Sequence, residues 1–259
     1  MDVGDAVLEA VVDTLARAGC VAAADEAAEL VAAAADEAEL RTWAARRAGG
    51  EPLAWVVGAV RFAGCRVAVD AGVFVPRPQT EALVAAAARR LRPEMSVADL
   101  CTGCGAVAVA LARAVPGLRV VGVDIDPTAA RCALRNGVPV VVGRVGTVLQ
   151  SGRFDLVTAV APYVPSSALA FLPSDARDHE PVTALDGGPD GLSVARTVVA
   201  DAARLLVPGG WLLIEIGGDQ DLRLRQCLVE HGFGPATVWR DEDGDVRGLE
   251  TRRCHNEGW

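Results

Sequence analysis

The sequence lacks a long apolar run. Hydrophobic residues make up 51% of the 259 residues, but charges or helix breakers interrupt every stretch of about 18 residues, the length a membrane helix needs. The start of the chain is not basic, since Asp2, Asp5 and Glu9 stand there, whereas a secretory signal begins with positive charge. We therefore expect a cytoplasmic protein with no membrane partner.

Basic residues, histidines and paired cysteines are also scarce. The chain has 25 Lys and Arg against 34 Asp and Glu, which gives a net charge of -9 and disfavours a nucleic-acid partner. The three histidines show no metal-like spacing with cysteines, so we expect no metal. The seven cysteines are scattered, which is typical of reduced thiols, and only Cys101 and Cys104 form a C-x-x-C pair. We interpret these two as small residues that fill a loop.

The chain divides into three segments. Residues 1–50 are rich in Ala, Leu, Val and Glu at helical spacing, which predicts a small helical domain. Residues 51–72 contain two short apolar runs, Trp55–Gly58 and Arg61–Val69, which predict a linking β-hairpin. Residues 73–259 alternate short apolar strands with helices, the pattern of a doubly wound, mostly parallel α/β sheet. We expect strands at 96–100, 119–124, 138–142, 154–160, 210–216, 237–240 and 249–253, and helices at 80–91, 106–114, 127–136, 191–206 and 220–231.

A glycine-containing turn follows the strand at 96–100. Its residues are Cys101, Thr102, Gly103, Cys104 and Gly105, between that strand and a helix, where a nucleoside-type cofactor can approach the backbone. The next strand ends in Asp124, whose carboxylate can accept hydrogen bonds from two ribose hydroxyls. The turn lacks the third glycine of a dinucleotide loop, which favours S-adenosylmethionine and leaves Asp99 to face its amino-acid half. A tight turn with no ligand is the alternative.

A second candidate loop follows the strand at 154–160. Because ligands of doubly wound sheets lie beyond the carboxyl ends of the strands, Val160, Ala161, Pro162 and Tyr163 should face the cofactor. The prolines hold the backbone extended, so carbonyl groups can point at a nitrogen substrate, and Tyr163 offers a ring face. By itself, the loop is also compatible with a Pro-rich turn that packs an aromatic ring.

Several blocks together resemble the HemK/PrmC family of protein-(glutamine-N5) methyltransferases. The resemblance runs from about residue 48 to the C-terminus, and the blocks lie at 50–54, 74–81, 99–106, 177–181, 184–192 and 208–210. It implies a class I S-adenosylmethionine-dependent methyltransferase that acts on a side-chain nitrogen. In the best-known members this is the Gln of the Gly-Gly-Gln motif of peptide-chain release factors.

The resemblance also implies roles for individual residues. Residues 101–105 would hold the methionine end of the cofactor, Asp124 the ribose and residues 160–163 the acceptor, while the N-terminal helices would help to bind a protein substrate. The remaining candidates in these blocks are, for the cofactor, Arg77, Pro78, Arg144 and Val145; for the substrate, Phe74, Glu81, Asp178 and His179; and for catalysis, Glu180.

Two residues depart from the family pattern. Val160 replaces the Asn of Asn-Pro-Pro-Tyr, and it cannot orient or polarise an amide nitrogen through hydrogen bonds. Arg144 stands near the adenine position where the family usually has an acidic residue. Three hypotheses follow: a glutamine N-methyltransferase acting on a release factor, an N-methyltransferase of a small molecule such as arginine, and a non-catalytic S-adenosylmethionine-binding protein.

Overall fold

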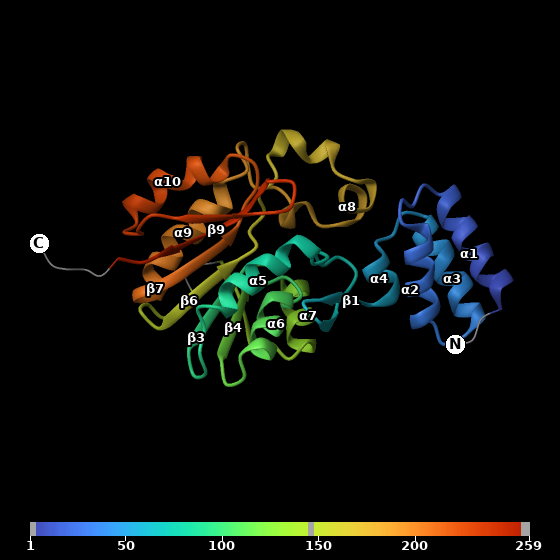
Figure 1. Cartoon of the computed structure of the whole chain (residues 1–259), viewed down its shortest axis with the longest axis horizontal. Coiled ribbons are helices and arrows are strands. Elements are labelled where there is room, and N and C mark those ends of the chain that lie inside the picture. Colours follow the sequence, from blue (N-terminus) through green and yellow to red (C-terminus); the bar gives the residue numbers. More distant parts are fainter. Residues whose placement is uncertain (1–3, 145–147, 255–259) are drawn as a thin grey trace, which may run out of the picture.

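The molecule consists of a small helical bundle and a larger α/β body, joined by a short β-hairpin (Figure 1). The computed structural model describes residues 4–144 and 148–254. The bundle lies at one end of the long axis, and the segment that contains α8 (Ser174–His179) lies at the side of the body next to it.

The bundle is formed by four helices, α1 (Asp5–Arg17), α2 (Ala23–Ala33), α3 (Glu37–Ala48) and α4 (Leu53–Val57). The interior residues Leu15, Leu30 and Leu40 are fully buried in one apolar cluster. The α4 helix corrects the prediction of a strand at Trp55–Gly58. Pro52 precedes it and Gly58 ends it in a left-handed conformation, and Val56 packs into the bundle.

The linking hairpin consists of β1 (Ala59–Phe62) and β2 (Cys65–Ala68), paired antiparallel. Asn136 attaches it to the body, because its side chain accepts a hydrogen bond from Ala68 N and donates one to Ala68 O. The same amide nitrogen donates to the carbonyl of Cys104, at 2.8 Å. One side chain therefore fixes the hairpin against the predicted cofactor loop.

Within the described ranges, seven strands form the main sheet in the order β5-β4-β3-β6-β7-β9-β8. Neighbours from β5 to β7 are parallel, whereas β9 runs antiparallel to β7 and β8. The predicted doubly wound, mostly parallel fold is confirmed. The strands are β3 (Ser96–Leu100), β4 (Arg119–Asp124), β5 (Val140–Val142), β6 (Phe154–Ala159), β7 (Leu206–Glu215), β8 (Thr237–Arg240) and β9 (Val246–Arg252).

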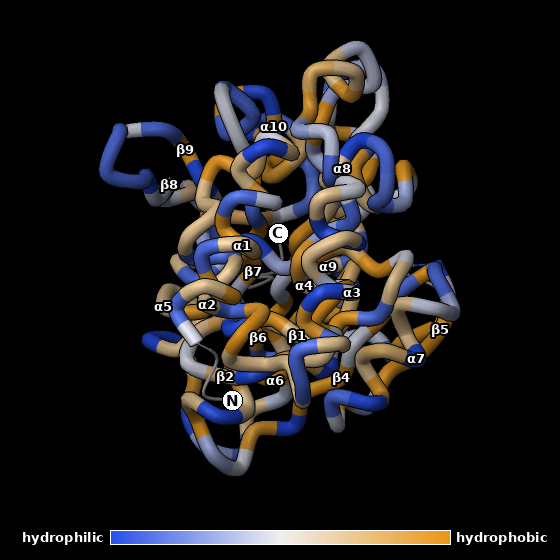
Figure 2. The backbone as a smooth tube through the Cα atoms, turned by 90° about the vertical axis from the view of Figure 1, so that its right-hand side faces the viewer, coloured by the Kyte–Doolittle hydropathy of each residue, from blue (hydrophilic) through white to orange (hydrophobic). Residues whose placement is uncertain are grey.

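Helices cover both faces of the sheet. One face packs against α5 (Glu81–Ala88), α6 (Ala106–Ala114) and α7 (Pro127–Arg135), and the other against α9 (Ser193–Leu205) and α10 (Gln220–Glu230). Strand side chains alternate between the two apolar clusters, as a pleated sheet requires. Figure 2 shows the central strands as largely hydrophobic and the tip between β8 and β9 as hydrophilic and projecting from the body.

The segment between β6 and α9 contains structure that the sequence patterns did not predict. It forms η2 (Ser166–Phe171), α8 and η3 (Val182–Ala184). A further short helix, η1 (Pro78–Thr80), precedes α5. These elements are too short to show a helical period, so their position depends on the contacts they make with the rest of the molecule.

Candidate functional site

The predicted cofactor loop turns sharply at the carboxyl end of β3. Cys101, Gly103 and Gly105 all have positive φ values, of 55°, 57° and 82°. The loop is fastened to β4, since Thr102 N donates to Val123 O at 3.1 Å and Gly103 N donates to an oxygen of Asp124 at 2.8 Å. The structure thus brings together the loop and the acid that the sequence proposed as its partner.

Asp99 stabilises this loop through hydrogen bonds of its side chain. One carboxylate oxygen accepts a hydrogen bond from the Thr102 hydroxyl at 2.6 Å, and the other accepts one from the Thr158 hydroxyl at 2.7 Å. The side chain is only 2% exposed, so its carboxylate is turned toward the loop and β6. Burial raises the pKa of Asp99 from 3.8 to about 6, although the two hydroxyls lower it in part.

This burial predicts a pH dependence of stability. Because the folded-state pKa of Asp99 lies above the unfolded value, the native state binds more protons between these two values, and stability falls as pH rises through them. We expect the unfolding free energy of the wild type to fall by about 2 kcal/mol from pH ~4 to ~6, relative to Asp99→Asn. Urea unfolding of both proteins across this range measures the difference, and parallel curves would contradict the prediction.

Asp124 and Gly103 fit a nucleoside cofactor. The second oxygen of Asp124 accepts a hydrogen bond from Asp126 N at 2.9 Å, so backbone donors hold the carboxylate at the end of β4. A Cβ added to Gly103 would have no heavy atom within 4 Å among the described residues other than its two chain neighbours. That open space beside the loop backbone is what close approach of a ligand requires. The residues present therefore match the requirements of S-adenosylmethionine.

The two loop cysteines show no sign of redox or metal chemistry. Burial raises the pKa of the Cys104 thiol to about 12, and it also raises that of Cys101. A thiolate is the form that binds metals or attacks disulfides, and burial disfavours it. Among the described residues, no group of three or more His, Cys, Asp or Glu could hold a metal ion.

The predicted acceptor loop lies at the ends of β6 and β7, next to a carboxylate that sequence reasoning missed. Tyr163 is half-buried in this loop, and burial together with the charge and hydrogen bond of Glu215 raises its pKa to about 12. Glu215 is the last residue of β7 and is 3% exposed. Its position at the end of a predicted strand could have marked it as a candidate.

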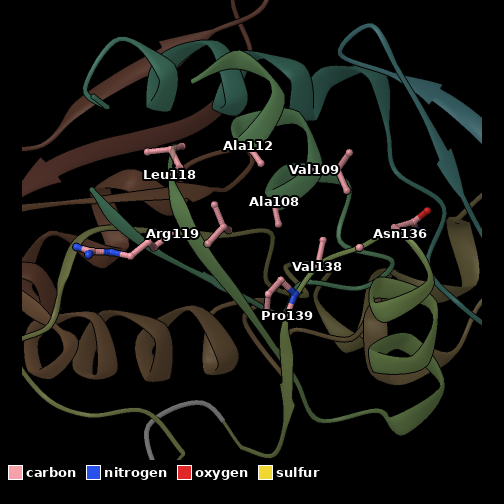
Figure 3. A pocket seen from close by; sticks show the side chains of 10 residues that line it. Ala108, Val109, Ala112, Leu118, Arg119, Asn136, Val138 and Pro139 are labelled. Atoms are coloured by element: carbon pink, nitrogen blue, oxygen red, sulfur yellow. The ribbon is translucent and has the colours of Figure 1, made fainter. Parts of the chain in front are cut away.

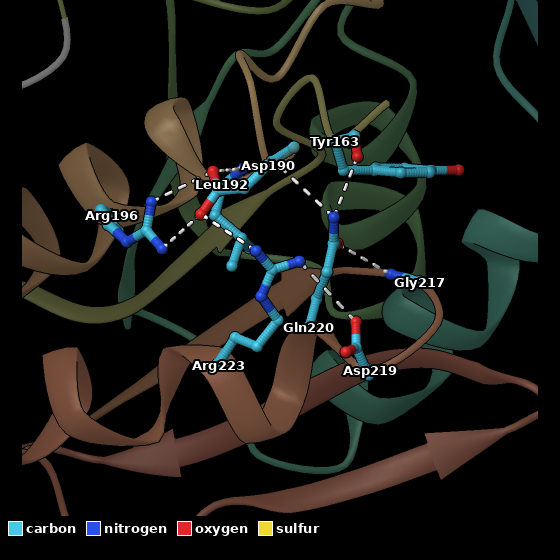
Figure 4. Close-up of polar contacts among 9 residues, drawn as sticks. Tyr163, Asp190, Leu192, Arg196, Gly217, Asp219, Gln220 and Arg223 are labelled. Carbon is cyan, nitrogen blue, oxygen red and sulfur yellow. Dashed lines mark hydrogen bonds and ion pairs between the residues drawn. The ribbon is translucent and has the colours of Figure 1, made fainter. Parts of the chain in front are cut away.

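A buried amide holds this loop in place. The Gln220 side chain donates to Tyr163 O at 2.9 Å and to Gly191 O at 3.3 Å, and it accepts from Gly217 N at 3.0 Å (Figure 4). Gly187 packs closely against the same loop, since an added Cβ would lie 2.7 Å from Pro162 O. The backbone of residues 162–163 is thus fixed by a neighbouring glycine-rich loop and by the start of α10.

Arg77, Phe74 and Glu180 form a second group. Arg77 donates to Glu180 at 2.7 Å and stacks on the ring of Phe74, with its guanidinium carbon 4.9 Å from the ring centre. Glu180 is 4% exposed, and burial raises its pKa although Arg77 lowers it. The predicted cofactor residue Arg77 and the predicted catalytic residue Glu180 are therefore ion-paired. Pro78, beside them, is exposed at the start of η1.

Several predicted site residues make other contacts. Glu81 accepts a hydrogen bond from Ala63 N at 2.9 Å, which ties α5 to the turn of the linking hairpin. Asp178 is exposed and pairs with its neighbour Arg177 at 2.7 Å. His179 packs edge-on against Trp55 of α4, with ring centres 6.3 Å apart. Arg144 is exposed just after β5, and Val145 lies outside the described residues.

A cavity of about 490 Å³ lies elsewhere (Figure 3). It is bordered by the outer side of α6, the start of β4 and the residues before β5, including Ala112, Leu118 and Pro139. No residue of the predicted site lines it. Because ligands of doubly wound sheets bind beyond the carboxyl ends of the strands, we do not assign this cavity to the cofactor.

Comparisons with known proteins identify relatives that match most of the chain. No model of a protein family matches the chain. The release factor glutamine methyltransferase of Geobacter sulfurreducens is 38% identical over 213 residues, which is 80% of this chain and 75% of the relative. The enzyme of the same name from Deinococcus radiodurans is 40% identical over 228 residues, or 84% and 81%.

A solved structure shares the fold. The E. cuniculi Mtq2-Trm112 complex, described as responsible for methylation of the termination factor eRF1, aligns with a TM-score of 0.54 at 21% identity. The alignment covers 71% of this chain and 99% of that one.

The fold and the methyltransferase relatives define a class I methyltransferase that uses S-adenosylmethionine. The sequence identities of 38% and 40% over most of the chain also identify the family. The chain belongs to the family of release factor glutamine methyltransferases, the HemK/PrmC family, and is an N-methyltransferase. The non-catalytic hypothesis is therefore disfavoured.

Proposed function

We propose that this protein methylates the side-chain amide nitrogen of a glutamine in a peptide-chain release factor, in the cytoplasm. Family membership supports the reaction, and the names of the relatives support the acceptor. The observation that carries the proposal is the arrangement at the carboxyl ends of three neighbouring strands. The loop at 101–105 follows β3, Asp124 ends β4, and the proposed acceptor loop follows β6, on the other side of β3. No helix in the described part of the chain could span a membrane.

The chain's own residues position the two reactants. When bound, S-adenosylmethionine supplies an electrophilic methyl group. The backbone of residues 101–105 and the Asp124 carboxylate would hold its two ends, with Asp99 as a support for the loop. Tyr163 and the carbonyls of residues 160–162 would hold the acceptor nitrogen. Holding two reactants in a reactive geometry is a large part of what such a site contributes, because it removes the entropic cost of their encounter.

The helical bundle and α8 would hold the protein part of the substrate. They are joined by His179 against Trp55 and by Arg47, which pairs with Glu26 at 2.6 Å and lies 3.8 Å from Asp175. Phe171, at the end of η2 and 87% exposed, offers apolar surface in the segment that contains α8. A surface built from both domains suits a folded protein substrate better than a free amino acid.

Methyl transfer from labelled S-adenosylmethionine tests the proposal. The acceptors are a release factor, the same factor with its Gly-Gly-Gln glutamine changed to alanine, free glutamine and free arginine. We expect label on the unmodified factor alone, with loss of signal when the glutamine is replaced. Label on free arginine or glutamine and none on the factor would overturn the proposal in favour of a small-molecule acceptor.

A further inference from the structure

Glu215 is a buried carboxylate with an unsatisfied oxygen. Its Oε2 has no hydrogen-bond partner among the residues that the structure describes, and the same holds for Oγ1 of the neighbouring Thr80. Burial raises the pKa of Glu215, while the nearby Thr80 and Tyr163 hydroxyls lower it in part. A buried polar atom without a partner is costly, and such an exception in a native protein calls for an explanation.

The sheet register places this carboxylate beside Val160. Ala159 of β6 pairs with Ile214 of β7, so the next residues along these parallel strands, Val160 and Glu215, are neighbours. Side chains alternate along a strand; Leu213 belongs to the apolar cluster on the α5 face, and the partly buried Val160 packs against that cluster. Glu215, two residues after Leu213, points to that face as well. The valine side chain offers no hydrogen bond, whereas the neighbouring carboxylate of Glu215 can accept one.

The charged groups around Glu215 leave it available. Arg77 and Arg247 both lower its pKa, but Arg77 is paired with Glu180 at 2.7 Å and Arg247 with Asp241 at 2.6 Å. Tyr163 stands over the end of the strand, since its ring lies 3.9 Å from the Cβ position of Gly217. The carboxylate is therefore enclosed by the acceptor loop and by η1, without a partner that uses its second oxygen.

We propose that Glu215 binds the acceptor nitrogen and takes its proton, which deepens the proposed function and rests on it. A primary amide offers two N–H donors, and one of them would satisfy the free oxygen of Glu215. As the nitrogen lone pair forms the bond to the methyl carbon, the carbon–sulfur bond breaks and its electron pair stays on sulfur. The nitrogen then loses one proton to the Glu215 carboxylate, which returns it to water. Glu215 thereby performs, from β7, the hydrogen bonding that Val160 cannot.

The substitution Glu215→Gln tests this role. We expect kcat to fall about 100-fold, because general-base assistance of this kind is worth 10²–10⁴, with S-adenosylmethionine affinity within about twofold. The carboxylate must be ionised to act, so the wild type should lose kcat/KM toward acid pH, and this acid limb should be absent from the variant. The melting temperature at pH ~8 should not fall, because the variant removes a buried charge whose folded pKa is raised.

Glu250→Gln is the matched control. Glu250 is also a buried glutamate of the sheet, 8% exposed on β9, but its two oxygens accept hydrogen bonds from Arg90 at 2.8 and 3.2 Å. We expect this variant to lower the melting temperature and to keep kcat within about threefold. Adding Val160→Asn to the Glu215→Gln protein should restore activity about tenfold, because an amide at that position offers the acceptor a hydrogen bond.

A readout independent of turnover uses Tyr163, the single tyrosine of the chain. With a ¹³Cζ tyrosine label and S-adenosylhomocysteine bound, propionamide should shift the one resonance in the wild type and in Glu250→Gln, and not in Glu215→Gln. An equal shift in all three proteins, or Glu215→Gln activity above half of wild type, would overturn the proposal. If the wild type methylates no release factor, the proposed function fails, and the propionamide titration still decides the role of Glu215.

Discussion

Asp124→Asn is expected to weaken S-adenosylmethionine binding about 100-fold or more, because we propose that this carboxylate makes two charge-assisted hydrogen bonds to the ribose hydroxyls, each worth about 1.5–3 kcal/mol. The structure adds a second reason. The carboxylate accepts hydrogen bonds from Gly103 N and Asp126 N, and an amide can offer only one acceptor oxygen to these donors. Calorimetric titration of the cofactor measures the loss.

Asp126→Asn provides the control for this prediction. Asp126 lies two residues further on and caps α7 by accepting a hydrogen bond from Thr128 N at 2.7 Å. Asparagine is as good an N-cap as aspartate, so we expect cofactor affinity within about threefold of wild type. Circular dichroism should show both variants folded. Asp124→Asn binding within about fivefold of wild type would mean that this acid does not hold the ribose.

Gln220→Leu is expected to reduce kcat about 100-fold with little effect on cofactor affinity, since misplacing a positioned group commonly costs that much. The leucine leaves Tyr163 O, Gly191 O and Gly217 N without the hydrogen bonds that the amide makes. The acceptor loop then loses its attachment to α10, while residues 101–105 keep theirs. Gln220 acts through the loop, so it is a positioning residue. Steady-state kinetics with both substrates separates kcat from the two KM values.

The matched control is Gln226→Ala on the same helix. Gln226 is exposed and bonds only to Glu230 among the described residues, at 2.7 Å. We expect its kinetics to equal wild type within about twofold. The two ion pairs of Asp190, with Arg196 at 2.7 Å and Arg223 at 3.3 Å, lie beside Gln220 and remain in both variants (Figure 4). A Gln220→Leu enzyme with unchanged kcat would show that the hydrogen bonds of Gln220 are not needed to position the loop.

Short-range patterns predicted that the turn at 101–105 and Asp124 lie together. Strand, glycine turn, helix and the acid at the end of the next strand follow each other within about thirty residues, and the structure brings Gly103 and Asp124 to 2.8 Å. This worked because parallel neighbours in a doubly wound sheet place consecutive strand ends side by side. That Asp99 faces the amino-acid half of the cofactor stays a prediction. Its carboxylate supports the loop through Thr102 and Thr158, and Thr158 lies 59 residues away.

The polar groups around the predicted acceptor loop were missed because they are also distant from it in the sequence. Glu215 and Gln220 follow Tyr163 by more than fifty residues, and no local period or spacing connects them to it. Trp55–Val57 read as a strand because Val and Trp favour strands, but the bundle buries Val56 as part of a helix. Asp178 and His179 were predicted to contact the substrate and Glu180 to act in catalysis; in the structure Glu180 pairs with Arg77, whereas Asp178 pairs with Arg177 and His179 packs against Trp55.

The sequence by itself determined the fold class and the family, and it predicted the turn at 101–105 beside Asp124, because each depends on residues close together in the chain or on several short blocks. Only the tertiary structure decided which polar groups meet at the acceptor end. There the pairing of β6 with β7 sets Glu215 beside Val160, and α10 brings Gln220 to the carbonyl of Tyr163. The physical reason is that burial and strand register, which set the partner and the charge of a carboxylate, are properties of the packed sheet.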